Sequence, residues 1–293
     1  MKIRIKMKTI LITGINGFLG SNLAKALSAE YNIVGLEYSL ENLFRIGTCN
    51  YKLYSAKDGI PATIFTDQTI DIVVHTATFY GRNNEDYLKM FDANLYSPFN
   101  LLDKAIQHGC HMFVNTDTVL DRFVSTYALT KKHFQEWLYL RKNEIKVVNM
   151  QLEHFYGAGA NPNNFITVMI KKLKNNEPQI DLTLGEQQRD FVYINDIVNA
   201  YLTVIKKQDE LSEHYTSLQV CTNQLISIKD LMIYLKGITN SNSTLNFGAI
   251  PYRENELMHS ETDNTALINI GWKPQFTIEE GIKLTLTNSC NSI

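Results

Sequence analysis

The sequence predicts an α/β protein built on a doubly wound parallel sheet, followed by a smaller C-terminal region. In the first half of the chain, apolar β-branched runs alternate with longer segments of helical periodicity, the pattern of a parallel sheet covered by helices on both faces. A glycine-rich turn directly follows the first of these runs and opens the first helix. The 293 residues are 44% hydrophobic and 20% charged, which is ordinary for a globular protein with a sizeable core.

The expected strands and helices alternate along the first half. The predicted strands are the apolar runs 8–13, 32–37, 70–78, 111–116 and 145–151. The predicted helices are the segments 17–30, 87–107 and 127–142. Because ligands of such sheets bind beyond the carboxyl ends of the strands, residues at those ends are the candidates for function.

The turn TGINGFLG lies between the first predicted strand and the first helix. Gly14 would permit the tight turn, Gly17 would let backbone amides approach a pyrophosphate, and Gly20 would let the helix pack closely on the strand. The position of the motif favours dinucleotide binding over a glycine turn with no ligand. The residues expected to line the cofactor here are Gly14, Asn16, Gly17, Phe18, Leu19 and Gly20.

Glu37 ends the second predicted strand, about 20 residues beyond the glycines, where a carboxylate can accept both ribose hydroxyl protons. A carboxylate there repels a 2'-phosphate and gives NAD a slight preference. Arg45 lies close enough in sequence to swing in and favour NADP instead, so both cofactors stay open. The alternative is that Glu37 is a solvated charge at the end of a strand.

The stretch NTDTVLDRFVSTYALTK, residues 115–131, predicts proton-transfer chemistry. Tyr127 and Lys131 are four apart in a helical segment and therefore share one face. The lysine ammonium is expected to favour the phenolate and lower the tyrosine pKa, which would make Tyr127 a general acid or base. Thr116, at the end of the preceding strand, could hold the developing charge on the reacting oxygen.

The turn-rich segment GAGANPNN, residues 157–164, predicts the entry to a second region. We expect residues 1–157 to form the dinucleotide-binding domain and residues 158–293 to be mostly substrate-binding. Residues 189–205 are typical of a strand followed by a helix, with Asn195 or Asp196 as its cap. The segment 190–208 is expected to pack back on the first domain.

Charge and cysteine usage narrow the class of partner. The formal charge of −2, from 28 basic and 30 acidic residues, offers no field for nucleic acid or an anionic membrane. No apolar run approaches the roughly 20 residues of a membrane span, and we expect no cleaved signal. The scattered cysteines 49, 110, 221 and 290 suggest reduced thiols in the cytoplasm, and we expect no metal site.

Further motifs extend over nearly the whole chain: DIVVHTAT, DANLYSPFNLLDKA, HFYGAG, GEQQRDFVYINDIVNA, PYRENE and GWKPQFTIEEGI. Together with TGINGFLG and YALTK, they resemble the extended short-chain dehydrogenase/reductase family, and within it the nucleotide-sugar-modifying enzymes. The resemblance implies a Rossmann-type core, a nucleotide-sugar substrate and a homodimer formed through the segments 87–107 and 127–142.

The same resemblance assigns roles to individual residues. It makes Thr116, Tyr127 and Lys131 the catalytic group, and it assigns the clamping of the substrate pyrophosphate to Arg189 and Arg253. Each arginine could instead pair with a nearby carboxylate, Arg189 with Asp190 or Asp196 and Arg253 with Glu254 or Glu256. The remaining residues that it places at the cofactor or the substrate are Thr76, Ala77, Asn94, Asp117, Tyr127 and Lys131.

Two departures from the family pattern bear on the catalytic threonine and on the type of reaction. The loop between Thr116 and Tyr127 is short, which leaves the choice of Thr116 over Thr118 less firm than that of the tyrosine and lysine. NTDTVLD is also similar to the signature of the 4,6-dehydratases, but Thr118 replaces the glutamate that their elimination needs. The NTDT motif and the short loop are most similar to those of the CDP-paratose and CDP-abequose synthase type of 4-ketoreductase.

The sequence therefore predicts an NAD(P)-dependent reductase of the C4 ketone of a nucleotide-linked 4-keto-6-deoxy or 3,6-dideoxy hexose. A 4-epimerase that retains its cofactor would use the same Tyr127 and Lys131. A non-catalytic dinucleotide-binding protein on this fold is the third alternative.

Overall fold

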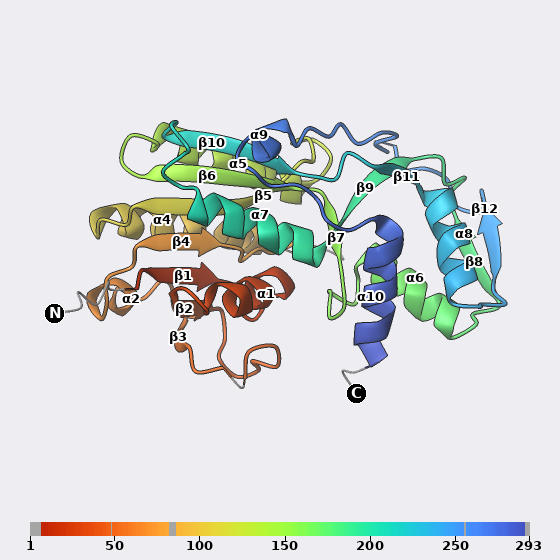
Figure 1. Ribbon diagram of the computed structural model, residues 1–293, viewed down its shortest axis with the longest axis horizontal. Coiled ribbons are helices and arrows are strands. Elements are labelled where there is room, and N and C mark those ends of the chain that lie inside the picture. The colour runs from red at the N-terminus through yellow and green to blue at the C-terminus, as the bar shows by residue number, and fades with distance from the viewer. Residues whose placement is uncertain (1–6, 48, 82–85, 255, 291–293) are drawn as a thin grey trace. The chain divides into compact units, whose positions relative to one another are not determined.

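The computed structural model describes residues 7–47, 49–81, 86–254 and 256–290 (Figure 1). Its chain divides into two compact units, Met1–Leu152 with Val198–Leu218, and Glu153–Ile197 with Gln219–Ile293. The division follows Leu152, and the segment that returns to the first unit is Val198–Leu218.

The first unit is built on a parallel seven-stranded sheet with the strand order β10-β6-β5-β4-β1-β2-β3. β1 lies between β2 and β4, so the chain winds outward from β1 in both directions, which confirms the predicted doubly wound fold. The strands are β1 (Thr9–Thr13), β2 (Asn32–Glu37), β3 (Lys52–Ser55), β4 (Ile72–His75), β5 (Met112–Thr118), β6 (Lys146–Leu152) and β10 (Tyr215–Val220).

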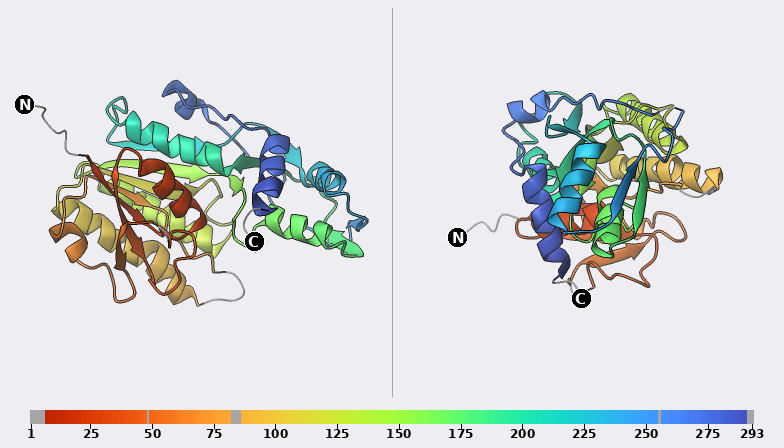
Figure 2. Two further views of the ribbon diagram at one scale, coloured as in Figure 1. Left: turned by 60° about the horizontal axis from the view of Figure 1, so that its bottom comes forward. Right: turned by 90° about the vertical axis from the view of Figure 1, so that its right-hand side faces the viewer.

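Helices cover both faces of this sheet. α1 and α7 lie on one face, and α4 and α5 lie on the other (Figures 1 and 2). The core under α5 joins Phe113 of β5 to Phe134 and Leu138 of that helix. The helices are α1 (Phe18–Leu27), α2 (Thr63–Thr66), α3 (Tyr87–Phe91), the π-helix η1 (Asp92–Tyr96), α4 (Ser97–Gln107), α5 (Thr126–Leu140) and α7 (Ile194–Lys206).

The second unit contains two small sheets. In the three-stranded sheet, the central β9 runs parallel to β7 and antiparallel to β11, while β8 and β12 form a parallel pair. Its strands are β7 (His154–Tyr156), β8 (Gln179–Leu182), β9 (Gln188–Tyr193), β11 (Leu225–Ser227) and β12 (Thr244–Phe247). Its helices are α6 (Phe165–Lys174), α8 (Ile228–Ile238), α9 (Thr265–Asn269) and α10 (Ile278–Cys290).

The predicted cap of α7 was wrong. β9 ends at Tyr193 and α7 begins at the next residue, so Asn195 and Asp196 lie inside the first turn. Instead of capping, the Asp196 carboxylate accepts hydrogen bonds from the amides of Gln275 (2.9 Å) and Phe276 (3.2 Å). It therefore anchors the segment that leads into α10.

The remaining expectations concern membranes, metals and thiols. No helix within the described ranges combines the length and apolar character needed to cross a membrane. The same ranges contain no group of three or more His, Cys, Asp or Glu side chains arranged to hold a metal ion. Cys49, Cys110 and Cys221 are free thiols. The Cys290 side chain lies outside the part that the structure describes.

Candidate active site

The glycine turn is shaped so closely that side chains cannot replace its glycines. Gly14 has a φ of +63°, and a Cβ on it would lie 2.9 Å from the Cα of Ala77. A Cβ on Gly17 would lie 2.9 Å from the Gly14 carbonyl oxygen, and one on Gly20 only 2.2 Å from the same oxygen. The turn therefore brings the amino end of α1 against the carboxyl ends of β1 and β4.

The amino end of α1 fits an anion. Gly17 caps the helix without a side-chain hydrogen bond, and its first turn carries no acidic residue. The partial positive charge of a helix terminus is thus opposed by no carboxylate in that turn, which suits the pyrophosphate of a dinucleotide. Phe18 and Leu19, both predicted at the cofactor, form this first turn.

Thr13 ties the predicted Thr76 and Ala77 to the glycine turn. Its hydroxyl oxygen accepts the amide protons of both residues, each at 3.2 Å, and its carbonyl accepts from the Thr76 hydroxyl at 2.7 Å. The same hydroxyl lies 2.8 Å from Nδ1 of His75, a buried histidine that packs against Phe113. Burial lowers the His75 pKa well below its usual value, so the ring is neutral and structural.

Glu37 and Arg45 meet at Asn16. The Glu37 carboxylate accepts from the Asn16 amide (2.9 Å) and the Tyr38 amide (3.1 Å). Arg45 donates to the Asn16 carbonyl through Nη1 (3.1 Å), and its own amide donates to Oδ1 of Asn16 (3.0 Å). The structure thus brings a carboxylate and a guanidinium together at the glycine turn.

Tyr127 and Lys131 lie in the first two turns of α5. The helix is capped by Ser125, whose hydroxyl accepts from the Ala128 amide at 3.1 Å. Lys131 is only 2% exposed, and this burial lowers its pKa to about 8, although Asp117 opposes the shift. Among the described residues its ammonium forms no ion pair, because Asp117 pairs with Lys132 instead.

The pKa of Tyr127 differs from the expectation. Burial raises it well above its usual value, Tyr80 and Asp117 add to the rise, and a hydrogen bond with Thr78 opposes it. Desolvation of the phenolate thus outweighs any help from the lysine four residues on. The Tyr80 ring stacks on Tyr127 with 4.9 Å between ring centroids. The raised pKa favours a protonated phenol, which is an acid rather than a base.

Asn94 is buried, and its side chain hydrogen-bonds to residues near Tyr127. It lies in η1, where the wider helical turn admits its side chain. Its Oδ1 accepts from the Phe79 amide (2.8 Å) and the Thr78 hydroxyl (3.2 Å), and its Nδ2 donates to the Phe79 carbonyl (2.8 Å) and to Thr130 of α5 (3.2 Å). Asn94 therefore orients Thr78, which bonds Tyr127.

Thr116 and Asp117 project to opposite faces of β5, because successive strand residues alternate. The Thr116 hydroxyl lies 2.7 Å from the hydroxyl of Tyr201 on α7. The buried carboxylate of Asp117 accepts hydrogen bonds at one oxygen from Lys132 Nζ of α5 (3.2 Å) and Asn149 Nδ2 of β6 (2.9 Å). Its other oxygen accepts from the Thr118 amide at 2.7 Å. The carboxylate predicted to contact substrate is thus enclosed by protein donors.

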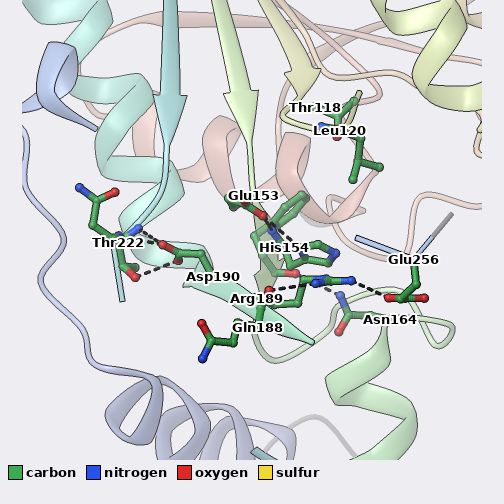
Figure 3. Close-up of polar contacts among 12 residues, drawn as sticks. Thr118, Leu120, Glu153, His154, Asn164, Gln188, Arg189, Asp190, Thr222 and Glu256 are labelled. Carbon is green, nitrogen blue, oxygen red and sulfur yellow. Dashed lines mark hydrogen bonds and ion pairs between the residues drawn. The ribbon is translucent and has the colours of Figure 1, made fainter. Parts of the chain in front are cut away.

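In the second unit, Arg189 is buried and pairs with Glu256 at 2.6 Å (Figure 3). Neither of the expected partners, Asp190 or Asp196, makes this ion pair. Asp190 instead accepts from the Thr222 amide and hydroxyl, each at 2.8 Å, and from the Asn223 amide at 2.7 Å. Burial nevertheless raises the Asp190 pKa to about 6.

A second buried carboxylate lies beside Arg189. An oxygen of Glu153 lies 3.0 Å from Nδ1 of His154 (Figure 3). Burial lowers the pKa of Arg189, and the negative charges of Glu256 and Glu153 oppose that shift. Oε1 of Glu153 is buried without a hydrogen-bond partner among the described residues. Arg253, predicted to act with Arg189, forms no ion pair with another described residue, so neither Glu254 nor Glu256 holds it.

Sequence reasoning missed several of these neighbours. Tyr201 was visible only as an aromatic residue on the apolar face of α7, and Lys132 only as a second lysine after Lys131. Thr78 lies inside DIVVHTAT, one position beyond the residues assigned to the cofactor. Glu256 lies within PYRENE but was considered a partner of Arg253 rather than of Arg189.

Comparisons with known proteins agree with this architecture. CDP-abequose synthase of Salmonella typhimurium is 33% identical over 287 residues, covering 94% of this chain and 96% of that protein. The dTDP-D-glucose 4,6-dehydratase of Mus musculus is 27% identical over 316 residues, covering 95% and 88%. Among solved structures, the UDP-glucose 4-epimerase of Thermotoga maritima has a TM-score of 0.85 at 21% identity, covering 97% and 99% of the two chains.

The model of the NAD-dependent epimerase/dehydratase family matches residues 10–216, the span from β1 into β10 that carries the glycine turn and the Tyr127–Lys131 pair. The chain therefore belongs to the NAD-dependent epimerase/dehydratase family, the extended branch of the short-chain dehydrogenases/reductases that its motifs resemble.

Proposed function

We propose that the protein reduces the C4 ketone of a nucleotide-linked 4-keto-6-deoxy or 3,6-dideoxy hexose, in the biosynthesis of deoxysugars such as those of lipopolysaccharide. The observation that carries the proposal is the enclosure of Asp117. Thr118 stands where a dehydratase needs glutamate, and Asp117 is bound by Lys132, Asn149 and the Thr118 amide. An elimination that needs two free carboxyl groups is therefore disfavoured, whereas a reduction needs only one acid beside the ketone.

Tyr127 is that acid. Its raised pKa keeps the phenol protonated at neutral pH, so it can donate its proton to the alkoxide oxygen as that oxygen forms. Thr116 donates a hydrogen bond to the same oxygen, and the Lys131 ammonium holds the ribose of the cofactor. The nicotinamide supplies the hydride when it is bound.

The cofactor is proposed to be NAD rather than NADP. Glu37 opposes a 2'-phosphate through charge repulsion, and its carboxylate is held against the glycine turn by the Asn16 amide. Arg45, bound to the same residue, keeps NADP as the alternative outcome. Titrating the wild type and Glu37→Gln with NADH and with NADPH tests this preference. Removal of the negative charge should improve the binding of NADPH but not that of NADH.

The substrate is proposed to be CDP-linked, since relatives named CDP-abequose synthase include one that is 33% identical to this chain over almost its full length. Arg189 and Arg253 are the proposed pyrophosphate ligands, because arginine suits the bidentate recognition of phosphate oxygens. Before it can do so, Arg189 must share or release Glu256.

A homodimer is also proposed. Exposed apolar side chains lie on α3, η1 and α5, an arrangement that favours association of two copies. They are Tyr87, Leu88, Phe91, Tyr96, Trp137 and Leu140. A cytoplasmic location is proposed from the free thiols of Cys49, Cys110 and Cys221.

The test is the loss of reduced-nicotinamide absorbance with CDP-, dTDP-, GDP- and UDP-linked 4-keto-6-deoxy sugars, each with NADH and NADPH. We expect stoichiometric oxidation with one sugar, abolished in Tyr127→Phe and retained in Tyr139→Phe, a matched change at an exposed position of the same helix. If no sugar oxidises the cofactor and the denatured protein releases NAD, the 4-epimerase alternative replaces the reductase. If neither happens, the non-catalytic alternative remains.

A further inference from the structure

One hydrogen bond connects the proposed reaction centre to the opposite face of the sheet. Tyr201 of α7 is wholly buried, and its hydroxyl lies 2.7 Å from Oγ1 of Thr116, two residues before the end of β5. Its neighbours on the buried face of α7, including Ala200 and Val204, are apolar. Among the described residues, Thr116 is the hydrogen-bond partner of this phenol, and a buried hydroxyl without a partner would be costly.

In the hydrogen bond between Tyr201 and Thr116, one hydroxyl is the donor and the other is the acceptor. A phenol is far more acidic than an aliphatic alcohol, so the phenol is the better donor. Burial raises the Tyr201 pKa, the hydrogen bond with Thr116 opposes the rise, and Asp117 adds to it; because burial dominates, the phenol keeps its proton across the physiological range. Tyr201 then donates to Thr116, and the proton of Thr116 itself is left for another acceptor.

Thr116 differs from Tyr201 in accessibility. It keeps part of its surface exposed, whereas Tyr201 does not. Tyr201 is also among the groups that raise the Tyr127 pKa, so the two phenols are close enough to interact. The Thr116 hydroxyl is thus bonded to a phenol that interacts electrostatically with the proposed acid.

We propose that Tyr201 is a positioning residue that fixes the rotamer of Thr116 and directs the Thr116 proton toward the reacting oxygen. A hydroxyl that accepts one hydrogen bond becomes a stronger donor in the next, so Tyr201 also strengthens the bond that Thr116 makes to the forming alkoxide. The inference rests on the proposed reduction, because that reaction supplies the oxygen. It assigns a role to a residue of α7, outside the sequence motif that carries Thr116, Tyr127 and Lys131.

The test compares Tyr201→Phe, Thr116→Val and the double variant in the absorbance assay. Because the interaction strengthens only as charge develops, Tyr201→Phe should lower kcat about tenfold while KM for sugar and cofactor stays within twofold. The double variant should be no slower than Thr116→Val, since Tyr201 acts through Thr116. Tyr156→Phe is the matched control: it removes the hydroxyl of another buried tyrosine, bonded to the Ile278 carbonyl at 3.2 Å, and should leave kcat unchanged.

A second readout does not depend on turnover. Urea unfolding of the same set should show that the effects of Tyr201→Phe and Thr116→Val on the unfolding equilibrium constant are not multiplicative, because each removes the same hydrogen bond. Multiplicative effects would overturn the hydrogen bond itself. A normal kcat in Tyr201→Phe, or a double variant slower than Thr116→Val, would overturn the positioning role alone. A wild-type protein that neither reduces nor epimerises any sugar would overturn the proposed function, and the role of Tyr201 in it.

Discussion

Gly20→Ala offers the sharpest test of the cofactor site, because its consequence can be worked out from the backbone. The added Cβ would lie 2.2 Å from the Gly14 carbonyl oxygen, 2.9 Å from the carbonyl carbon and 3.0 Å from the Cα of Ile15. All three are backbone atoms, so no side chain can rotate away. The amino end of α1 and the glycine turn must separate by about 0.8 Å or more before the contact becomes tolerable.

The cost has two parts. Forced overpacking of this kind typically costs about 1–3 kcal/mol, and the better helix propensity of alanine returns about 0.5–1 kcal/mol, so we expect a net loss of about 1–2 kcal/mol in stability. The amides of residues 17–19 move with the helix. Since losing a hydrogen bond to a charged group typically costs about 1.5–3 kcal/mol, NADH should bind about 10- to 100-fold more weakly.

NADH binding by fluorescence titration and thermal unfolding measure the two effects. Gly237→Ala is the matched control, because it changes a helical glycine of α8 whose Cβ would meet nothing within 4 Å. It should gain up to about 1 kcal/mol in stability and bind NADH as the wild type does. Wild-type NADH affinity in Gly20→Ala would refute the assignment of this turn as the cofactor site.

Three further changes probe charges. Burial lowers the Lys131 pKa to about 8, so NADH affinity should fall as pH rises through about 8, with no such fall in Lys131→Met. An NADH affinity that does not change with pH would contradict this assignment. In the unfolded chain the lysine keeps its proton up to about pH 10.5, so the stability of the protein should rise as pH increases from about 8 to 10.5. Lys132→Met strands the buried Asp117 charge and should cost about 2–4 kcal/mol in urea unfolding, whereas a loss below 1 kcal/mol would mean that Asn149 suffices. Glu256→Gln removes an anion bonded to Arg189 and should tighten CDP binding severalfold in calorimetry, while weaker binding would mean that the ion pair orients the guanidinium.

Sequence alone was enough for the doubly wound fold, for the strands β1, β2, β4, β5 and β6, for the glycine turn and for the pairing of Tyr127 with Lys131 on one helix. It did not predict the two edge strands of the sheet, β3 and β10. These features depend on periodicity and on spacings of a few residues, which the backbone geometry of strands and helices converts directly into shape. The predicted helix over 87–107 was only partly right, because the π-helical turn at Asp92–Tyr96 divides it. Its cause is tertiary, since Asn94 bonds both the loop after β4 and Thr130 of α5.

Only the tertiary structure decided which charges and hydroxyls meet. Thr116 and Asp117 are adjacent in sequence, but the helices that cover the two faces of β5 give the threonine Tyr201, 85 residues away, and the aspartate Lys132, 15 residues away. The burial that raises the Tyr127 pKa is likewise set by packing and outweighs the lysine that local spacing emphasises. The sequence determined which residues could perform the chemistry, and the packing of the first unit determined their partners and protonation states, because desolvation and hydrogen bonding depend on neighbours that are remote along the chain.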